Sequence, residues 1–336
     1  MEERKKNHID LAFQSQTQKT TRDKRFNYEP MLSGHPEEIF KPFDFLGKVQ
    51  KIPIWVSSMT GGTKLASKIN ANLARACQEF GMGMGLGSCR IILDNNDYFS
   101  DFDVREIIGH DYPLYANLGI AQIEQLIDSK HIDKAVSLVE RLKADGLVIH
   151  VNPLQEWFQP EGDKLKRPAI EIIKEFIDHT DLRIIVKEVG QGMGPASLLE
   201  LLKLPLEAIE FAAYGGTNFA KIELMRSDET RQQLFEPLSY VGHDAEEMTN
   251  MVNDIVESEP DVKTRQIIIS GGIKSFLQGY YLIKRCRIPA VYGQASAFLK
   301  YAKENYESLR KFVEYQVKGL EMAFAFLRAK ESDSDD

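Results

Sequence analysis

A repeat of short apolar runs is the feature that most constrains what this chain can fold into. Each run is rich in β-branched or other apolar residues, and most are followed by a stretch with the apolar spacing of a helix. Eight runs occur, at 52–57, 81–87, 113–118, 146–151, 183–189, 208–212, 266–270 and 289–293. Strict alternation of strand and helix indicates a parallel sheet, because a crossover helix is needed between parallel strands.

Eight units favour a closed barrel over an open doubly wound sheet, so the predicted fold class is α/β, a (β/α)8 TIM barrel. The open sheet is the alternative, but no GxGxxG motif opens the first unit. A longer gap between the sixth and seventh runs predicts an inserted loop near 218–242. Helices are predicted at 66–80, 120–143, 168–179, 195–202, 245–257, 275–284 and 297–328.

The rest of the chain predicts one domain with appendages. Residues 1–50 form an N-terminal arm with poor periodicity, 51–330 the barrel, and 331–336 a short acidic tail that we expect to be disordered.

The net charge is −8 and no long basic block occurs, which disfavours nucleic-acid binding. The charged N-terminus lacks the apolar core of a signal peptide, and no apolar run approaches the ~18 residues that span a membrane. Three cysteines without a CxxC pair indicate a reducing compartment, so a cytoplasmic protein is expected.

Polar and glycine residues follow every predicted strand, at the end of the barrel where TIM-barrel active sites lie. The alternative is that such loops are polar in any barrel. The last two loops are more specific. Gly271 and Gly272 let backbone N–H groups approach a ligand, and Ala295-Ser296 opens a helix whose N-terminus favours an anion. With Thr217 as a further donor, these loops predict a site for a phosphorylated cofactor.

Lys187 lies within an apolar run and is expected to be buried, where an ammonium needs a partner. The partner is either a barrel carboxylate or an anionic ring such as reduced flavin. His150 and Asn152 share one face of a strand and can point into the site, although a core histidine is equally compatible with the pattern. Glu156, after Gln155, is either a solvated charge or a ligand for Mg²⁺ bound to substrate phosphates.

Taken together, the motifs resemble those of the type 2 isopentenyl-diphosphate Δ-isomerases. The matching stretches span most of the chain and are Arg4-Lys5 with His8, SMTGG, GSCR, the Asn117 loop, HVNPLQE, VKEVGQGM, YGGTNF, SGGI and QAS. The resemblance implies interconversion of isopentenyl and dimethylallyl diphosphate with reduced FMN, Mg²⁺ and NADPH as the reductant. It also implies a homo-oligomer, either a tetramer or an octamer.

The resemblance also implies roles for individual residues. The FMN contacts would be Met59, Thr60, Gly61, Ser88, Asn117, Lys187, Thr217, Gly271, Gly272, Ala295 and Ser296. The substrate contacts would be Arg4, Lys5, Ser88, Arg90, His150, Asn152 and Gln155, with Glu156 holding Mg²⁺. Catalysis would involve Lys187, His150, Asn152 and Gln155, with Lys187 stabilising the anionic reduced flavin. By composition alone, Arg4 and Lys5 would instead belong to a solvated tail.

One stretch departs from the family pattern, and two other functions stay open. Many relatives carry a Trp-Gly-Ile-Pro-Thr-like stretch where this chain has LSYVGHDAEEM, which leaves the conformation of that loop open. A 2-hydroxy-acid oxidase would need a histidine after the seventh strand, where Gly271-Gly272-Ile273-Lys274 stands. A non-catalytic flavin- or phosphate-binding protein would have no need of the Gln155-Glu156 pair.

Overall fold

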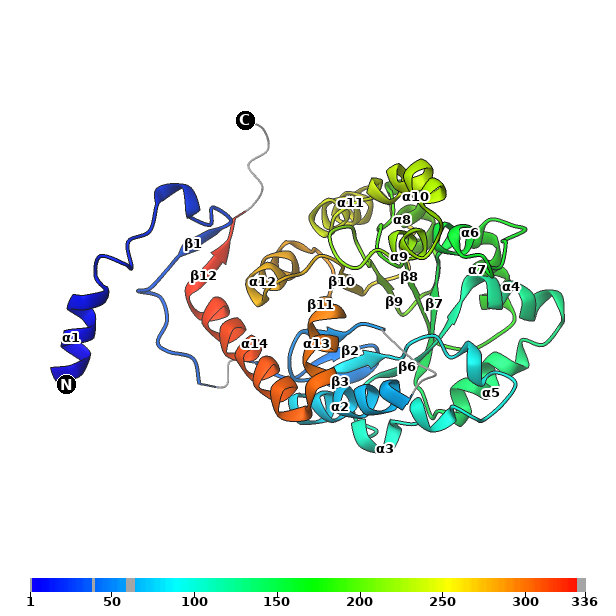
Figure 1. The fold of residues 1–336 in the computed structure, drawn as a ribbon, viewed down its shortest axis with the longest axis horizontal. Coiled ribbons are helices and arrows are strands. Elements are labelled where there is room, and N and C mark those ends of the chain that lie inside the picture. The colour runs from blue at the N-terminus through cyan, green and yellow to red at the C-terminus, as the bar shows by residue number, and fades with distance from the viewer. Residues whose placement is uncertain (1, 38–39, 59–63, 331–336) are drawn as a thin grey trace.

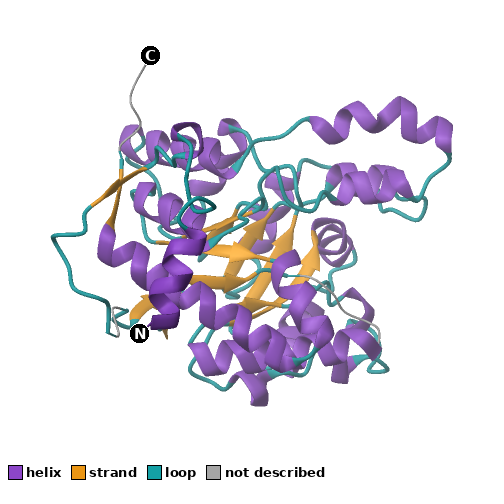
Figure 2. Ribbon diagram, turned by 60° about the vertical axis from the view of Figure 1, so that its left-hand side comes forward, coloured by secondary structure: helices purple, strands orange, loops and turns teal. Residues whose placement is uncertain are grey.

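The fold is a closed barrel of eight parallel strands with helices packed around it (Figures 1 and 2). The computed structural model describes residues 2–37, 40–58 and 64–330. The barrel strands are β4 (Ile54–Val56), β5 (Gly83–Gly85), β6 (Leu114–Gly119), β7 (Gly146–His150), β8 (Ile184–Lys187), β9 (Ala208–Glu210), β10 (Ile267–Ser270) and β11 (Ala290–Gln294). Each of the eight predicted runs overlaps one of these strands, with β6 and β11 extending one residue beyond their runs, and β11 pairs with β4 to close the barrel. The predicted (β/α)8 fold is confirmed.

Helices lie between the strands, but three predicted segments differ in detail. The helices are α2 (Lys64–Phe80), α3 (Arg105–Ile108), α4 (Ile120–Asp128), α5 (Asp133–Arg141), α6 (Pro153–Phe158), α7 (Ala169–Asp178), α8 (Pro195–Leu202), α9 (Phe219–Met225), α10 (Glu229–Phe235), α11 (Ala245–Ser258), α12 (Phe276–Arg285), α13 (Ser296–Glu304) and α14 (Tyr306–Phe326). Four 3-10 turns add Lys19–Thr21, Arg90–Ile92, Phe99–Asp101 and Glu236–Tyr240.

The predicted helix 120–143 is wrong as one element, because Lys130 has a φ of 61° between α4 and α5. The predicted helix 297–328 likewise divides at Asn305, whose extended backbone ends α13. The Asn305 side chain accepts a hydrogen bond from the N–H of Ser308 and caps α14. The predicted loop 218–242 is largely helical, since Asn218 and Asp228 cap α9 and α10 in the same way.

A hairpin closes the amino-terminal end of the barrel. Its strands are β2 (Phe43–Phe45) and β3 (Lys48–Gln50), and they pair antiparallel. Phe45 and Leu46 are fully buried in one cluster with inward-facing barrel residues, namely Trp55, Tyr115, Val148, Ile185, Ala208, Ile268 and Val291. The N–H of Leu46 also donates to the Gln266 side chain at 2.7 Å. The hairpin therefore seals the floor, and the barrel opens to solvent at the carboxyl ends of its strands.

The N-terminal arm is tied to the other end of the chain. Strand β1 (Phe26–Tyr28) pairs antiparallel with β12 (Leu327–Ala329), directly after α14. Ahead of β1, helix α1 (Glu2–Leu11) is exposed at residues 3–11 and stands apart from the barrel (Figure 1). Within the described ranges, no helix is long and apolar enough to cross a bilayer. The predicted acidic tail lies outside the described residues.

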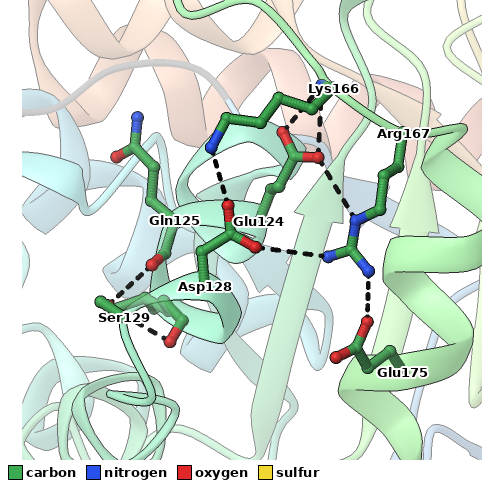
Figure 3. A network of polar contacts seen from close by, with 8 residues as sticks. Glu124, Gln125, Asp128, Ser129, Lys166, Arg167 and Glu175 are labelled. Atoms are coloured by element: carbon green, nitrogen blue, oxygen red, sulfur yellow. Dashed lines mark hydrogen bonds and ion pairs between the residues drawn. The ribbon is translucent and has the colours of Figure 1, made fainter.

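An ion-pair network joins α4 to the segment that leads into α7 (Figure 3). Arg167 lies 3.6 Å from the buried carboxylate of Glu124 and 2.5 Å from Glu175. Lys166 pairs with Asp128 at 2.9 Å. Because Glu124 also accepts the backbone N–H of Lys166, the network holds the chain that follows the fourth barrel strand. It therefore supports the segment between β7 and α7, which carries Asn152, Gln155 and Glu156.

Candidate functional site

A cavity of about 390 Å³ opens at the carboxyl ends of β8 to β11 and extends to Ser57 and Ser58 after β4. This volume lies within the range of small-molecule and cofactor sites. The cavity brings together six residues that the sequence predicts for the cofactor, namely Lys187, Thr217, Gly271, Gly272, Ala295 and Ser296. We call this cavity the cup.

Two glycine pairs form one wall of the cup. A Cβ on Gly216 would lie 2.9 Å from the backbone nitrogen of Gly272, and a Cβ on Gly272 would lie 3.0 Å from the carbonyl oxygen of Tyr214. Gly271 has a φ of +89°, and its Cβ would meet the backbone N and O of Ala213 at 2.1 and 2.2 Å. The glycines are therefore required for two loops to pack backbone to backbone, before any ligand is considered.

The N-terminus of α13 forms another part of the lining. Ala295 precedes the nine-residue helix that starts at Ser296, and both residues line the cup. The unpaired N–H groups of a first helical turn and the helix dipole favour an anion at this place. With Thr217 in the same lining, the α13 N-terminus is compatible with a phosphate group.

The Lys187 side chain is 6% exposed and lines the cup. Its Nζ donates to the carbonyl oxygen of Glu188 at 2.9 Å. In the described part of the chain it forms no ion pair with a carboxylate, so the alternative of a salt bridge to a barrel carboxylate is not supported. A buried ammonium with unused donors is suited to a ligand that carries negative charge or carbonyl oxygens.

Three polar side chains form one row across the top of the barrel. In the strand register His150 is the partner of Lys187, and Lys187 is the partner of Glu210. Two residues earlier on the same strands stand Val148, Ile185 and Ala208, which pack in the barrel interior. Because side chains two apart on a strand point the same way, the row faces inward, directly above the apolar core.

His150 is held in a defined orientation. Its Nδ1 lies 2.7 Å from Oδ1 of Asn117, whose Nδ2 donates to the carbonyl oxygen of Leu86 at 3.0 Å. Since that contact orients the amide, Nδ1 carries the proton and Nε2 keeps its lone pair. Desolvation, aided by the charge of Lys187, lowers the pKa of His150 to about 3. The imidazole is therefore neutral at physiological pH.

A second polar group surrounds the start of α6. Asn152 is buried, and its Nδ2 donates to Gln155 Oε1 at 3.1 Å and to Glu156 Oε1 at 2.9 Å. The other carboxylate oxygen of Glu156 accepts the backbone N–H of Asp163 at 2.9 Å. Arg90 then pairs with the Asp163 side chain at 2.9 Å. Four predicted site residues, Arg90, Asn152, Gln155 and Glu156, are thus linked by contacts through Asp163.

No group of three potential metal ligands occurs among the described residues, so Glu156 would be the single protein carboxylate that binds a cation.

A second hollow of about 320 Å³ adjoins the cup, and Val189 lines both. Its lining includes Asn152 and Gln155 at the start of α6, and also Gly192 and His243. Among the described residues that line it, none is a lysine or an arginine. An anionic ligand there would need positive charge from elsewhere.

The segment that departs from the family pattern packs against the loop after β8. The side chain of Gln191 donates to the backbone carbonyl oxygens of Leu238 and Val241. The backbone carbonyl oxygen of Gln191 accepts the N–H of His243. Glu188 organises the same loop by accepting three backbone N–H groups, and burial raises the pKa of its carboxyl. The segment thus forms part of the wall of the second hollow.

Other predicted residues lie elsewhere. Met59, Thr60 and Gly61 fall outside the described residues. Ser88 is exposed and does not line the cup. Arg4 and Lys5 belong to α1, which stands apart from the barrel, so the chain does not bring them to the cup in this conformation (Figure 1).

Sequence reasoning missed Glu210, Ser270 and Gln294, which all line the cup. Glu210 carried a usable signal, because it is a charge within the apolar run 208–212, as Lys187 is within 183–189. Ser270 and Gln294 are strand-end polar residues of a kind that any barrel contains, so their sequence signal is weak.

The barrel and its mouth define the class, a (β/α)8 barrel with an anion-compatible cavity at the carboxyl ends of its strands. Solved structures with this fold include a flavocytochrome b2 variant with sulfite bound, at 14% identity and a TM-score of 0.62 over 89% of this chain and 72% of that one. A mandelate oxidase variant with the monooxide FMN adduct has a TM-score of 0.56 at 14% identity, over 91% of this chain and 88% of that one.

Sequence comparison is more specific. No protein-family model matches the chain. The isopentenyl-diphosphate delta-isomerase of Rickettsia felis is 34% identical over 91% of this chain and 87% of its own length. The enzyme of the same name from Rickettsia prowazekii is 34% identical over 89% and 86%. The chain belongs to the isopentenyl-diphosphate delta-isomerase family.

Proposed function

We propose that the protein is a type 2 isopentenyl-diphosphate Δ-isomerase, which interconverts isopentenyl and dimethylallyl diphosphate with FMN in the cup. Family membership supports the reaction. The observation that carries the choice of cofactor is the Lys187 ammonium, which is buried in the cup without a carboxylate partner among the described residues. When bound, reduced FMN would supply the group that exchanges protons with the substrate, and NADPH would supply the electrons that keep it reduced.

The residues present fit FMN. The two glycine pairs and the α13 N-terminus can hold a phosphate, and Lys187 can stabilise the negative charge of a reduced isoalloxazine ring. His150, held neutral, adds no second positive charge beside Lys187 and offers Nε2 as an acceptor. The proposal assigns the proton transfer to the cofactor, as the family resemblance implies, and not to a pair of side chains.

The substrate diphosphate is assigned to the second hollow, beside Asn152 and Gln155. Since the described lining of that hollow includes no lysine or arginine, Mg²⁺ would neutralise part of the diphosphate charge. Glu156 would hold the ion, because a carboxylate oxygen that accepts one hydrogen bond still has a free lone pair.

The proposal keeps the predicted roles of Arg4, Lys5, Ser88 and Arg90 toward the diphosphate, and the predicted homo-oligomer. Because α1 stands apart from the barrel, Arg4 and Lys5 would reach the hollow only by movement of the arm or from a second copy of the chain (Figure 1). Deletion of residues 2–11 would then raise the KM for substrate and leave FMN affinity unchanged.

Turnover under anaerobic conditions tests the reaction. The purified protein with FMN, NADPH and Mg²⁺ should convert isopentenyl to dimethylallyl diphosphate and, in D₂O, exchange protons at C2 and C4. Absence of conversion and exchange, with FMN bound and reduced, would refute the isomerase assignment. The 2-hydroxy-acid oxidase alternative predicts flavin reduction by a 2-hydroxy acid instead, and the chain lacks a histidine in the run 271–274.

A further inference from the structure

Glu210 is a buried charge of the cup that none of the roles above uses. It ends β9, its side chain is 0% exposed, and it lines the cup. Its Oε1 accepts a hydrogen bond from the hydroxyl of Ser270 at 3.1 Å, but Oε2 has no partner among the described residues. A buried carboxylate oxygen without a donor is costly, so a donor from a bound ligand is the natural way to satisfy it.

Lys187 does not fill this role, although it is the register partner of Glu210 on the neighbouring strand. No ion pair between the two side chains occurs, and the Lys187 ammonium is directed to the carbonyl oxygen of Glu188 instead. The cup therefore presents a cation with unused donors beside an anion with an unused acceptor. A ligand that satisfies both must carry an acceptor close to a hydroxyl or N–H donor.

The order of the strands places that donor along the ligand. Lys187 is on β8, Glu210 on β9, Gly271 follows β10 and Ser296 follows β11, and these four strands are consecutive neighbours in the barrel. A ligand with its ring system at Lys187 and its phosphate between Gly271 and Ser296 must pass β9 between the two. In FMN the group between ring and phosphate is the ribityl chain, which carries three hydroxyl donors.

We propose that Glu210 binds the cofactor by accepting a hydrogen bond from a ribityl hydroxyl of FMN, with Ser270 orienting its carboxylate. The proposal rests on the function proposed above, namely that the cup holds FMN. It adds a binding residue outside the set that the sequence motifs imply. It also explains why an apolar strand ends in a charge that finds no ion-pair partner in the described chain.

The test measures dissociation constants for the apoprotein by titration with FMN and with three FMN analogues, each lacking one ribityl hydroxyl. The variant is Glu210→Gln, which keeps the shape of the side chain and removes its charge. The control is Glu207→Gln, which removes a carboxylate just before the same strand, where Glu207 pairs with Arg183 at 2.7 Å. Thermal unfolding of each apoprotein checks that the fold is retained.

We expect Glu210→Gln to weaken FMN binding on the order of 10-fold, the scale of one hydrogen bond to a charged group. The wild type should lose a similar factor for one analogue only, and Glu210→Gln should bind that analogue as well as it binds FMN. Glu207→Gln should bind FMN within about twofold of the wild type, because its carboxylate does not line the cup. If Glu210→Gln does not fold, titration of the wild-type apoprotein with the three analogues still tests the contact between Glu210 and a ribityl hydroxyl.

Unchanged FMN affinity in Glu210→Gln, or equal losses for all three analogues, would overturn the assignment of Glu210 while leaving FMN as the cofactor. Failure of the wild type to bind FMN at all would instead overturn the proposed function, and Glu210 with it. The two failures are therefore distinguishable in one set of titrations.

Discussion

Asn152 holds the Glu156 carboxylate by a side-chain hydrogen bond, with Nδ2 2.9 Å from Oε1. The second oxygen of Glu156 is held by the backbone N–H of Asp163. Both oxygens are thus oriented by neighbours from two different segments. The first turn of α6 acquires a fixed acceptor instead of a mobile acidic side chain.

Replacement of Asn152 by Ala should raise the Mg²⁺ concentration needed for half-maximal isomerase activity by about 10- to 100-fold, the usual effect of losing a group that orients a metal ligand. A Mg²⁺ titration of the initial rate checks this. Asn253→Ala removes a buried amide that donates to the carbonyl oxygen of Arg285 on the outer helices, and it should leave the Mg²⁺ requirement unchanged. An unaltered requirement in Asn152→Ala would contradict the role of Glu156 in metal binding.

Lys187→Ala should weaken the binding of reduced FMN at least about 10-fold more than that of oxidised FMN, because the ammonium interacts with a charge present only in the reduced ring. The corresponding measurement is the midpoint potential of the bound flavin, which should fall. Lys174→Ala, which removes a surface ion pair with Glu200 on the outer helices, should leave it unchanged. Equal losses for both redox states would argue against the charge interaction.

Substitution of Gly271 should destabilise the fold itself. The sequence predicts that Gly271 lets backbone N–H groups approach a ligand, but the first atoms that a Cβ would meet are the backbone of Ala213, at 2.1 Å. With the positive φ, Gly271→Ala should cost roughly 2–6 kcal/mol in unfolding free energy of the apoprotein. Gly109 has a φ of +78° and a ψ of 171°, with no atom within 4 Å of a built Cβ, so Gly109→Ala should cost only the backbone strain, about 1–3 kcal/mol. Similar losses in both variants would show that packing against Ala213 is unimportant.

The stability of the apoprotein should depend on pH through His150. Burial and the neighbouring Lys187 lower the pKa of His150 to about 3, against a value near 6.5 in the unfolded chain. The unfolded state therefore binds the proton first, and stability is lost as the pH falls below about 6.5. Between pH 7 and pH 5 the wild type should lose about 2 kcal/mol more than His150→Gln. Parallel pH profiles of the two unfolding free energies would contradict this expectation.

The repeat of apolar runs was sufficient to predict the barrel, because burial on both faces makes parallel strands nearly continuous in hydrophobicity. The ends of the helices were harder to predict from the sequence. Lys130, between α4 and α5, has a left-handed backbone conformation that a lysine seldom adopts and that the sequence pattern therefore does not predict. Asn305 interrupts a continuous helical pattern only because its side chain caps the next helix. Such breaks depend on tertiary packing more than on local apolar spacing.

Some residues of the site could also be predicted from the sequence, and others could not. Lys187, Thr217 and the glycine and helix-start residues of the last two loops were predicted from their positions in the repeat, and they meet in the cup. The role of Gly271 in backbone packing could not be predicted, because it depends on a loop from the preceding unit. Glu210 was overlooked although its sequence context matches that of Lys187.

The β2–β3 hairpin at the amino-terminal end of the barrel affects how ligands enter and leave the site at the opposite end. Phe45 and Leu46 seal the floor, so both proposed guests must enter and leave through one opening. FMN would occupy the cup beside Lys187, and the diphosphate the adjoining hollow at the start of α6. Because both sites share one opening, a bound substrate would slow the dissociation of the cofactor.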